Sequence, residues 1–275
     1  MEVKILEEQG DLVRFAVHGA DIALINAIRR VSIAEVPTLA IERVFIMENT
    51  SSFFDEIVAH RLGLIPLKVE EGFELNLPEE CECGGAGCFK CEVRLFLEVR
   101  EAPVDNYIVY SGHLRPEIPE VKVVSEKIPI VALAKGQSLV LEARARLGRG
   151  KEHAKWQPVA VAAYKYFPIL SIDREKCYSC GLCVENCPKK ILELDEEEKP
   201  RVTDIYACSL CRACEEVCDA EAISVKGSER DFIFTLETTG ALTPREVILK
   251  ACEILCNKLS QLRESFAQLE GGQGG

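Results

Sequence analysis

The chain of 275 residues is long enough to bury a sizeable core, as one large domain or two to three small ones. Its 48% apolar and 28% charged residues are typical of a soluble globular protein, and no apolar run reaches the ~18–20 residues of a membrane span. The net charge of −12, with scattered lysines and arginines, disfavours a surface built to neutralise phosphates, so we expect no direct nucleic-acid binding.

The N-terminal segment is acidic where a signal peptide carries a basic flank and a long apolar run, so we expect a cytoplasmic protein. Short strands are predicted at Val3–Leu6 and Leu12–Val17, on either side of a Gln-Gly-Asp turn. Asp21 is a suitable N-cap for a helix that must end before Pro37. The apolar face of this helix comprises Leu24, Ile25, Ile28 and Val31.

The middle of the chain is rich in predicted strands. Apolar residues alternate with charged or bulky neighbours at Val93–Val99, and further strands are predicted at Ser138–Ala145 and Val159–Tyr166. This region also contains a cysteine loop formed by Cys81, Cys83, Cys88 and Cys91. Because cytoplasmic thiols are normally reduced, four thiolates within eleven residues indicate a tetrahedral structural zinc site. Reduced free thiols or a pair of disulfides are the alternatives for this loop.

The strongest motif in the chain is a repeated cysteine pattern. The first set is Cys177, Cys180, Cys183 and Cys187, with the spacing Cys-x2-Cys-x2-Cys-x3-Cys followed by proline. The second set has the same spacing, at a constant interval from the first, and comprises Cys208, Cys211, Cys214 and Cys218. In bacterial two-cluster ferredoxins, the first three cysteines of such a set bind one cluster and the fourth binds the other.

This pattern predicts a ferredoxin-like module with two [4Fe-4S] clusters, one of which could be isolated in a [3Fe-4S] form. The ligands of one cluster would be Cys177, Cys180, Cys183 and Cys218. The ligands of the other would be Cys187, Cys208, Cys211 and Cys214. Two zinc sites or a disulfide knot are the alternatives, but they do not explain two tripled sets with identical spacing. Asp219 replaces the usual proline, a departure that could loosen the loop without removing a ligand.

The C-terminal segment predicts a strand and a long helix. The strand, Asp231–Glu237, alternates aromatic and polar residues. Thr243 as a cap, Pro244 in the first turn and Glu246 three residues after the cap then form a strong helix start. The helix carries an apolar heptad seam formed by Ile248, Cys252, Leu255, Leu259, Leu262, Phe266 and Leu269.

This heptad seam requires a partner helix, the alternative being a monomer that covers the seam internally. Cys252 and Cys256 lie four residues apart on the same helix. Because cysteine packs as a small apolar residue, we expect both to be core residues and not metal ligands.

Four segments carry a family resemblance that extends over essentially the whole chain. They are DIALINAIRRVSIAEVPTLAIE (Asp21–Glu42), DEIVAHRLGLIPL (Asp55–Leu67), GRGKEHAKWQPVAVAAY (Gly148–Tyr164) and DFIFTLETTGALTPREVILKA (Asp231–Ala251). In this order they are similar to the D subunit of archaeal RNA polymerase, which is related to the third-largest subunit of eukaryotic RNA polymerase II and to the N-terminal part of bacterial alpha. Many archaeal members carry a ferredoxin-like insert, and the loop at 81–91 resembles the zinc loop of the eukaryotic relative.

The resemblance implies an α+β fold in which an RNA polymerase alpha-like dimerisation domain receives two inserts. The dimerisation domain would comprise residues 1–41, the strand within 151–168, and the strand and long helix of 227–275. Residues 42–150 would form an inserted β-rich domain with the zinc-like loop. Residues 169–226 would form the inserted two-cluster ferredoxin-like domain.

The function that the resemblance implies is that of a non-catalytic scaffold subunit of DNA-directed RNA polymerase, the nucleotidyltransferase of transcription. In this family, the N-terminal and C-terminal helices of the D subunit pack against equivalent helices of subunit L. The heterodimer then recruits the small subunits N and P and the second-largest catalytic subunit. The chain itself contains no Asp-x-Asp element for two-metal phosphoryl transfer and no P-loop or Rossmann fingerprint, so we expect no active site on it.

A ferredoxin-type electron-transfer subunit of an oxidoreductase is the alternative function, but an electron carrier has no need of the split strand–helix elements around the cysteines. A further hypothesis combines the two functions. Cluster loss under oxygen would unfold the insert and weaken assembly, so that polymerase abundance responds to oxidation or iron supply. In the simpler version, the clusters only hold the insert folded.

Overall fold

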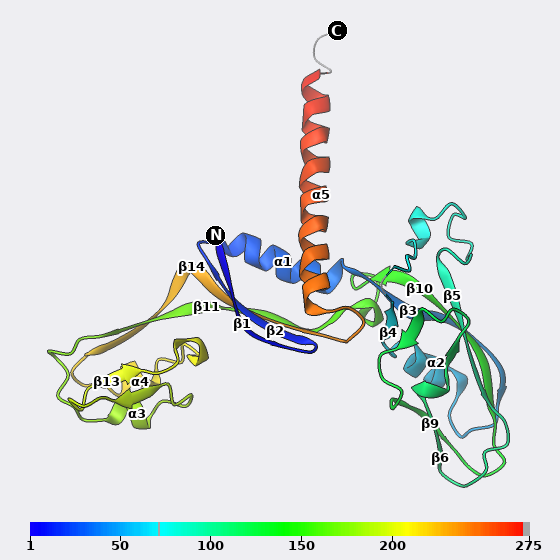
Figure 1. Ribbon diagram of the computed structural model, residues 1–275, viewed down its shortest axis with the longest axis horizontal. Helices are drawn as coiled ribbons and strands as arrows, with labels where there is room; N and C mark the ends of the chain where they lie inside the picture. Colours follow the sequence, from blue (N-terminus) through cyan, green and yellow to red (C-terminus); the bar gives the residue numbers. More distant parts are fainter. Residues whose placement is uncertain (71, 272–275) are drawn as a thin grey trace. The chain divides into compact units, whose positions relative to one another are not determined.

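The chain folds into two compact units, each assembled from separate stretches of sequence. The computed structural model describes the backbone of residues 1–70 and 72–271 and the side chains of residues 1–70 and 72–268 (Figure 1). Unit 1 comprises Met1–Glu8, Val13–Asn26 and Ala163–Thr235; unit 2 comprises Gln9–Leu12, Ala27–Ala162 and Leu236–Gly275. Helices accompany several separate sheets, in agreement with the predicted α+β class.

Unit 1 is built on a four-stranded sheet with the order β1-β2-β14-β11. The strands are β1 (Glu2–Gln9), β2 (Leu12–His18), β11 (Val159–Ile172) and β14 (Ile223–Thr238). Phe15 of β2 stacks on Phe234 of β14 with 5.3 Å between ring centroids. Such aromatic pairs contribute about 0.5–1.5 kcal/mol beyond their burial. Strands from the N-terminus, the middle and the C-terminal third of the chain therefore share one sheet.

Strands β11 and β14 are longer than the sequence predicts. β11 continues beyond Tyr166 and includes Pro168, which is tolerated because β11 lies at the edge of the sheet. β14 already begins at Ile223. A Cβ on Gly227 would lie 2.8 Å from the Cβ of Tyr166, so the close approach of these residues requires glycine. The two strands run directly into the eight-cysteine segment without a linker.

Short elements connect β11 to β14 and carry the repeated cysteines. They are α3 (Leu182–Glu185), the hairpin of β12 (Leu192–Leu194) and β13 (Pro200–Val202), the 3-10 helix η4 (Ile205–Ala207), and α4 (Ala213–Glu216). The buried residues that pack together here are Cys183, Cys187, Ile191, Leu192, Cys208, Cys214, Ile223 and Val225. Half of these eight residues are cysteines, so the segment has little apolar core apart from its thiols.

Helix α1 (Ile22–Ala34) lies where the sequence predicts a helix. The backbone N–H of Ala23 donates a hydrogen bond to the Asp21 carboxylate at 2.7 Å, which confirms Asp21 as the cap. Ile25 and Val31 are buried, whereas Leu24 is exposed. The predicted apolar face is therefore covered only in part by this chain.

Unit 2 contains a second four-stranded sheet, with antiparallel pairs in the order β3-β10-β5-β7. Its strands are β3 (Pro37–Asn49), β5 (Glu92–Val99), β7 (Arg115–Pro116) and β10 (Leu139–Arg149). Val93, Leu95 and Leu97 of β5 are buried with at most 1% of their surface exposed, and the exposed Arg94, Phe96 and Glu98 alternate with them. The predicted strand pattern is confirmed here.

Smaller elements complete the core of unit 2. They are α2 (Asp55–Gly63), the paired strands β4 (Leu67–Val69) and β8 (Val121–Val123), the paired strands β6 (Tyr107–Tyr110) and β9 (Pro129–Leu133), and the 3-10 helices η1 (Pro78–Glu80), η2 (Ser111–His113) and η3 (Ala154–Trp156). Val58 and Leu62 of α2 are fully buried in the same apolar cluster as β5. Unlike the eight-cysteine segment, this core is built from aliphatic side chains.

Helix α5 (Pro244–Gly271) is the predicted C-terminal helix and is continuous in Figure 1. Its capping box forms as the sequence predicts. The N–H of Thr243 donates to the Glu246 carboxylate at 2.7 Å, and the N–H of Glu246 donates to the Thr243 hydroxyl at 3.3 Å. Val247 and Ala251, in the first turns, are fully buried.

The predicted heptad seam changes from half-buried to exposed along α5. Ile248, Cys252 and Leu255 are half-buried. The exposed fractions of Leu259, Leu262 and Phe266 are 65%, 54% and 62%. Leu269 lies outside the described side chains. The chain does not cover the seam between residues 259 and 266, so the alternative of internal covering is wrong for this described part.

Cys256 corrects the expectation that both cysteines of α5 are core residues. Cys252 is half-buried, and burial raises the pKa of its thiol, but Cys256 is exposed. Cys256 lies nine residues after the fully buried Val247. At about 100° per residue this places it on the opposite face of the helix. Cys252 lies only about 40° away from Cys256 around the helix, so the difference in exposure follows from position along α5, whose residues become more exposed toward its C-terminal end.

Candidate functional site

The four cysteines of the predicted zinc loop lie together. Their sulfurs are separated by 3.6 Å between Cys81 and Cys88, 3.5 Å between Cys83 and Cys91, and 3.8 Å between Cys88 and Cys91. These distances exceed the ~2.05 Å of a disulfide bond. A tetrahedral zinc ion with Zn–S bonds of about 2.3 Å holds its sulfurs about 3.8 Å apart. The loop could therefore hold one metal ion of this kind.

Glycines shape this loop. Gly84, Gly85 and Gly87 have φ values of 62°, 80° and 92°, in the left-handed region that side chains rarely adopt. The tight turn between the second and third cysteines depends on them. The sequence pattern of cysteines and glycines therefore predicts both the ligands and the backbone that gathers them.

The thiols of this loop differ in their affinity for protons. Hydrogen bonding with Cys81, and then with Cys91, lowers the pKa of Cys83 to about 6. Burial raises the pKa of Cys91 to about 12. Four adjacent thiols cannot all ionise unless a cation balances their charge. A divalent ion would supply that charge, and its binding would release protons.

The repeat of the eight-cysteine segment extends to the backbone. Helices α3 and α4 begin at Leu182 and Ala213, which occupy equivalent positions in the two halves of the repeat. Three pairs of equivalent positions have positive φ, namely Ser179 and Leu210, Gly181 and Arg212, and Lys190 and Glu221. The two cysteine sets therefore lie on two copies of one loop–helix–turn conformation.

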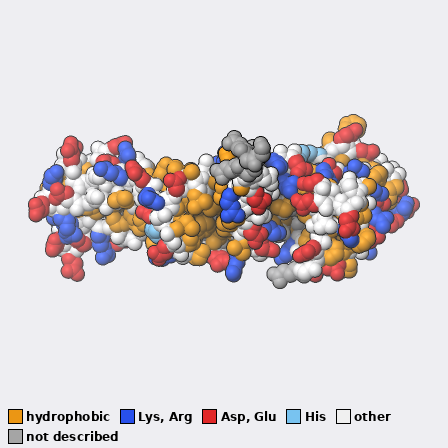
Figure 2. Space-filling view, turned by 90° about the horizontal axis from the view of Figure 1, so that it is seen from above, with side chains coloured by type: hydrophobic (Ala, Val, Ile, Leu, Met, Phe, Trp, Pro, Cys, Tyr) orange, Lys and Arg blue, Asp and Glu red, His pale blue; other side chains and the backbone are white. Residues whose placement is uncertain are grey.

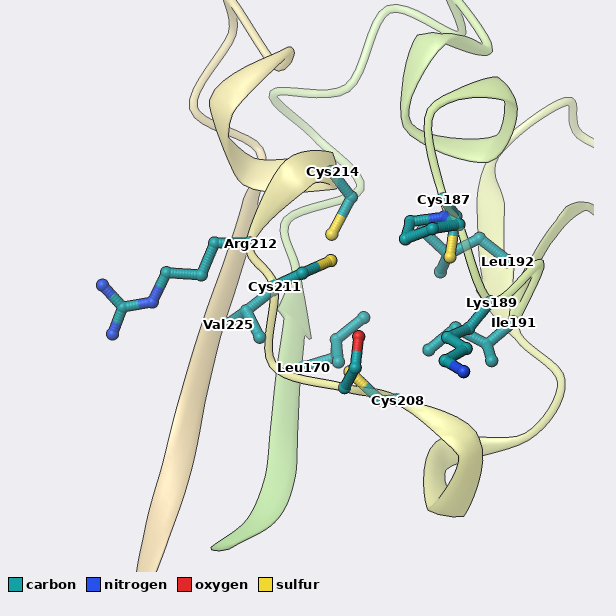
Figure 3. Close-up of a pocket in the computed structure, with 12 residues that line it drawn as sticks. Leu170, Cys187, Lys189, Ile191, Leu192, Cys208, Cys211, Arg212, Cys214 and Val225 are labelled. Carbon is teal, nitrogen blue, oxygen red and sulfur yellow. The ribbon is translucent and has the colours of Figure 1, made fainter. Parts of the chain in front are cut away.

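A small cavity lies between the first three cysteines of the second set and the last cysteine of the first set. Cys187, Cys208, Cys211 and Cys214 line it, together with apolar residues that include Leu170 and Val225. Figure 3 shows Cys211 and Cys214 on one side of the cavity and Cys187 on the opposite side. Burial raises the pKa of the Cys214 thiol to about 11. Four cysteines from both halves of the repeat thus meet around one space.

Burial and neighbouring charge also act on the thiols of the first cysteine set. Cys183 is buried, and burial followed by the charge of neighbouring Cys180 raises its pKa. Tyr178 lies beside this set, and Cys180 is the main cause of its raised pKa, with smaller contributions from partial burial, Asp219 and Cys218. Cys218 therefore lies near Tyr178.

Sulfur separation distinguishes the two cysteine regions. Among the described residues, the loop at 81–91 alone brings three or more ligand atoms of His, Cys, Asp or Glu all within 4.8 Å of one another. The sulfurs of each repeated set are spread more widely. A single ion needs ligands close together, whereas a polynuclear group keeps them apart around a larger volume. The residues fit one ion in the first region and larger groups in the second.

Two side chains that the sequence patterns did not single out contact the repeated cysteines. Lys165 Nζ donates hydrogen bonds to the carbonyl oxygens of Tyr206 at 2.7 Å and Cys208 at 2.6 Å. Lys199 Nζ donates to the carbonyl oxygen of Cys177. Lys165 lies far from Cys208 in the sequence, so no local spacing could have indicated the contact.

Charged side chains of both signs are interspersed over the surface in Figure 2. On the face shown, Lys and Arg do not gather into an extended field. Many of them pair with acids, as Arg94 does with Glu117 at 2.8 Å and Arg174 with Asp195 at 2.8 Å. None of the helices in the described part of the chain is long and apolar enough to span a membrane.

Comparisons with known proteins agree with this architecture. Residues 14–259 match the family described as the RNA polymerase Rpb3/Rpb11 dimerisation domain. The chain is 43% identical over 269 residues to the DNA-directed RNA polymerase subunit Rpo3 of Archaeoglobus fulgidus, covering 98% of this chain and 99% of that one. It is 44% identical over 264 residues to Rpo3 of Methanothermobacter thermautotrophicus, covering 95% and 97%. It is 38% identical over 269 residues to Rpo3 of Pyrobaculum islandicum, covering 97% of this chain and 95% of that one.

The matches extend through both units and through all the segments that carry the resemblance to the archaeal D subunit, as Rpo3 is also called. The resemblance is confirmed, and the chain belongs to the RNA polymerase Rpb3/Rpb11 dimerisation-domain family, among relatives of archaeal subunit Rpo3.

Proposed function

We propose that this chain is a non-catalytic scaffold subunit of a cytoplasmic DNA-directed RNA polymerase, and that it nucleates assembly by pairing with a subunit L-like partner. The observation that carries the proposal is the uncovered seam of α5, formed by Leu259, Leu262 and Phe266. Exposed leucine and phenylalanine at heptad spacing are favoured at helix–helix interfaces. Family membership supports assembly within a polymerase.

The energy available from this seam is sufficient for a specific contact. Each large apolar side chain that passes from water into an interface contributes about 1.5–3 kcal/mol. Three such residues lie within two turns of α5, and the exposed Ile22 and Leu24 of α1 offer further apolar surface. A partner helix of similar character would bury the seam of α5. We propose that this heterodimer then recruits small subunits of the N and P type and the second-largest catalytic subunit.

Nucleotide addition is proposed to take place on other subunits. Two-metal phosphoryl transfer needs clustered carboxylates, and the sequence contains no Asp-x-Asp element. The charges of this chain are instead organised in opposite-sign pairs on its surface. A role in which the chain positions catalytic subunits therefore fits its chemistry better than a role in the reaction itself.

We further propose that the eight repeated cysteines hold two iron–sulfur clusters that keep their segment folded. Cys177, Cys180, Cys183 and Cys218 would bind one, and Cys187, Cys208, Cys211 and Cys214 the other. The duplicated backbone and the cavity lined by Cys187 and the first three cysteines of the second set support this assignment. Cys81, Cys83, Cys88 and Cys91 would bind a structural zinc ion, which the sulfur separations support. The electron-carrier alternative is not favoured, because the relatives named above are polymerase subunits over nearly their full length.

Disruption of the seam tests the scaffold proposal. The double variant Leu259→Asp/Phe266→Asp should lose the subunit L-like partner, because it places two charges in the proposed interface. The matched control is Ser260→Asp/Gln268→Asp, whose positions are exposed on the other side of α5. Co-purification and light scattering after size-exclusion chromatography would measure the complex. Equal partner binding by both variants, or recovery of the native chain with a flavoprotein or hydrogenase and no polymerase subunit, would contradict the proposal.

A further inference from the structure

Two lysines reach equivalent atoms in the two cysteine sets. Lys165 donates to the carbonyl oxygen of Cys208, and Lys199 donates to that of Cys177. Cys177 and Cys208 are counterparts, since each is the first cysteine of its set. In both sets, therefore, a lysine ammonium group binds the backbone carbonyl of the first cysteine.

The two lysines are not themselves counterparts in the repeat. Lys165 lies on β11, before the repeated segment, whereas Lys199 lies just before β13, between the two sets. The interval that separates the two cysteine sets leads from Lys165 to Glu196 and from Lys199 to Arg230. The duplication of the loops therefore does not explain the shared contact. Two unrelated segments of the chain each supply a lysine ammonium group to the carbonyl oxygen of the first cysteine of a set.

The contacts of Lys165 fix the loop that carries Cys208. The 3-10 helix η4 ends at Ala207, and its last carbonyl groups lack partners within the helix. Lys165 satisfies the carbonyls of Tyr206 and Cys208 at 2.7 Å and 2.6 Å. The Tyr206 ring packs edge-on against Phe167, and its hydroxyl accepts a hydrogen bond from Lys4 at 3.1 Å. The loop is thus attached to strands β1 and β11 of the unit 1 sheet.

The position of each ammonium group has an electrostatic consequence. A thiol and a carbonyl on one residue share the same Cα, so holding the carbonyl limits the directions in which the thiol points. A cluster bound by four thiolates is anionic, and a nearby cation stabilises it. Arg212 also lines the cavity, but Figure 3 shows its guanidinium pointing away from the cysteines. Lys165 and Lys199, which bind backbone carbonyls of the cysteine loops, are placed to supply positive charge beside each loop.

We propose that Lys165 and Lys199 are a matched pair of positioning residues, each holding the first cysteine of one set and placing positive charge beside one of the two iron–sulfur clusters. The inference rests on the proposed function of the eight cysteines. Lys165 serves the site of Cys187, Cys208, Cys211 and Cys214. Lys199 serves the site of Cys177, Cys180, Cys183 and Cys218. Each lysine therefore acts on one site and not on the other.

The test compares Lys165→Met and Lys199→Met in the full chain, purified and reconstituted without oxygen. Two measurements read the sites separately. Hydrogen exchange with mass spectrometry resolves residues 206–212 from residues 177–183, and a spectroscopic redox titration resolves two reduction steps. Lys165→Met should speed exchange in the first peptide alone and move one reduction step to lower potential, because the more negative reduced form loses a stabilising cation. Lys199→Met should speed exchange in the second peptide alone and move the other step.

Controls separate positioning from general stability. Lys165→Arg, which retains charge and donors, should restore both readouts, and Lys226→Met, which removes an exposed lysine of β14, should change neither. If Lys165→Met loses iron, selective loss from the site of Cys208 supports the proposal, whereas equal loss from both sites overturns it. Unchanged exchange and potentials in iron-loaded variants also overturn it. Absence of iron and sulfide from the reconstituted native chain would instead refute the cluster assignment, a separate outcome.

Discussion

The two cysteine-rich regions of this chain relate to their surroundings in opposite ways. The loop at 81–91 holds neighbouring sulfurs 3.5–3.8 Å apart and belongs to unit 2, whose core is a large cluster of aliphatic residues. In the eight-cysteine segment, four cysteines are themselves half of the buried cluster. A metal ion is therefore an addition to a fold that has its own core in the first region. In the second region, the bound groups would be the core.

The strongest test of this difference is removal of the bound groups. Without iron, residues 173–222 should lose nearly all hydrogen-exchange protection, because the large buried apolar side chains of the cluster are few: Ile191 and Leu192, with Ile223 and Val225 just beyond the segment. Structural metal sites in small domains contribute about 10–16 kcal/mol, more than such a core could replace. Unit 2 should keep its protection in the same sample. Native-like protection of both regions in the iron-free chain would contradict the comparison.

Loss of one zinc ligand should have a smaller and local effect. Cys91→Ser should weaken zinc binding by about 3 kcal/mol, a quarter of a typical site of about 10–16 kcal/mol, or roughly 100-fold in affinity. Competition with a chromophoric chelator measures this change. The sheet formed by β3, β10 and β5 should remain folded, because its aliphatic core does not depend on the loop. Cys256→Ser, at an exposed position of α5, is the matched control and should leave zinc binding unchanged.

Zinc binding at the loop should also depend on pH. Zinc binds thiolates, and Cys91, with a pKa of about 12, must release its proton when the metal binds. Affinity should therefore fall as the pH falls, by about tenfold per pH unit for each proton released. Cys83, with a pKa of about 6, becomes protonated only at lower pH, so the dependence should steepen by one proton below that value.

The slope of log affinity against pH, measured above and below pH 6, checks this expectation. A Cys83→Ser chain should bind zinc more weakly without the steeper part of the curve. A slope that stays constant through this range in the native chain would show that Cys83 does not exist as a thiolate before zinc binds.

The smallest expected effect concerns backbone shape within the repeat. Arg212 has a φ of 61° at the position where its counterpart Gly181 has 74°. A left-handed conformation costs a residue with a side chain about 1–2 kcal/mol, and the flexibility of glycine in the unfolded chain offsets about 0.5–1 kcal/mol of it. Arg212→Gly should therefore stabilise the iron-loaded segment by up to about 1 kcal/mol, measured by hydrogen exchange at residues 205–222. Gly181→Ala is the reciprocal control and should destabilise the first half by about 1 kcal/mol.

Local patterns were sufficient to predict the two long helices and six of the strands, but not β3, α2 or the short paired strands of unit 2. The capping residues Asp21, Thr243 and Glu246 make the hydrogen bonds that their spacing indicates, because a cap depends only on residues within one helical turn. Alternation identified β5 for a similar reason, since one face of the strand meets the core. The lengths of β11 and β14 were underestimated, because pairing between distant strands extends them beyond their local pattern.

The sequence by itself determined which cysteines belong together, because the repeated spacing and the glycines at 84, 85 and 87 are local properties of the chain. It also determined that α5 has an apolar seam. Only the tertiary structure decided how far apart the sulfurs lie, where the seam becomes exposed, and that Cys256 faces outward. The tertiary structure alone also decided the contacts of Lys165 and Lys199 with the first cysteine of each set. The contact of Lys165 with Cys208 joins the sheet of unit 1 to a segment far along the chain, and no residue spacing records that approach.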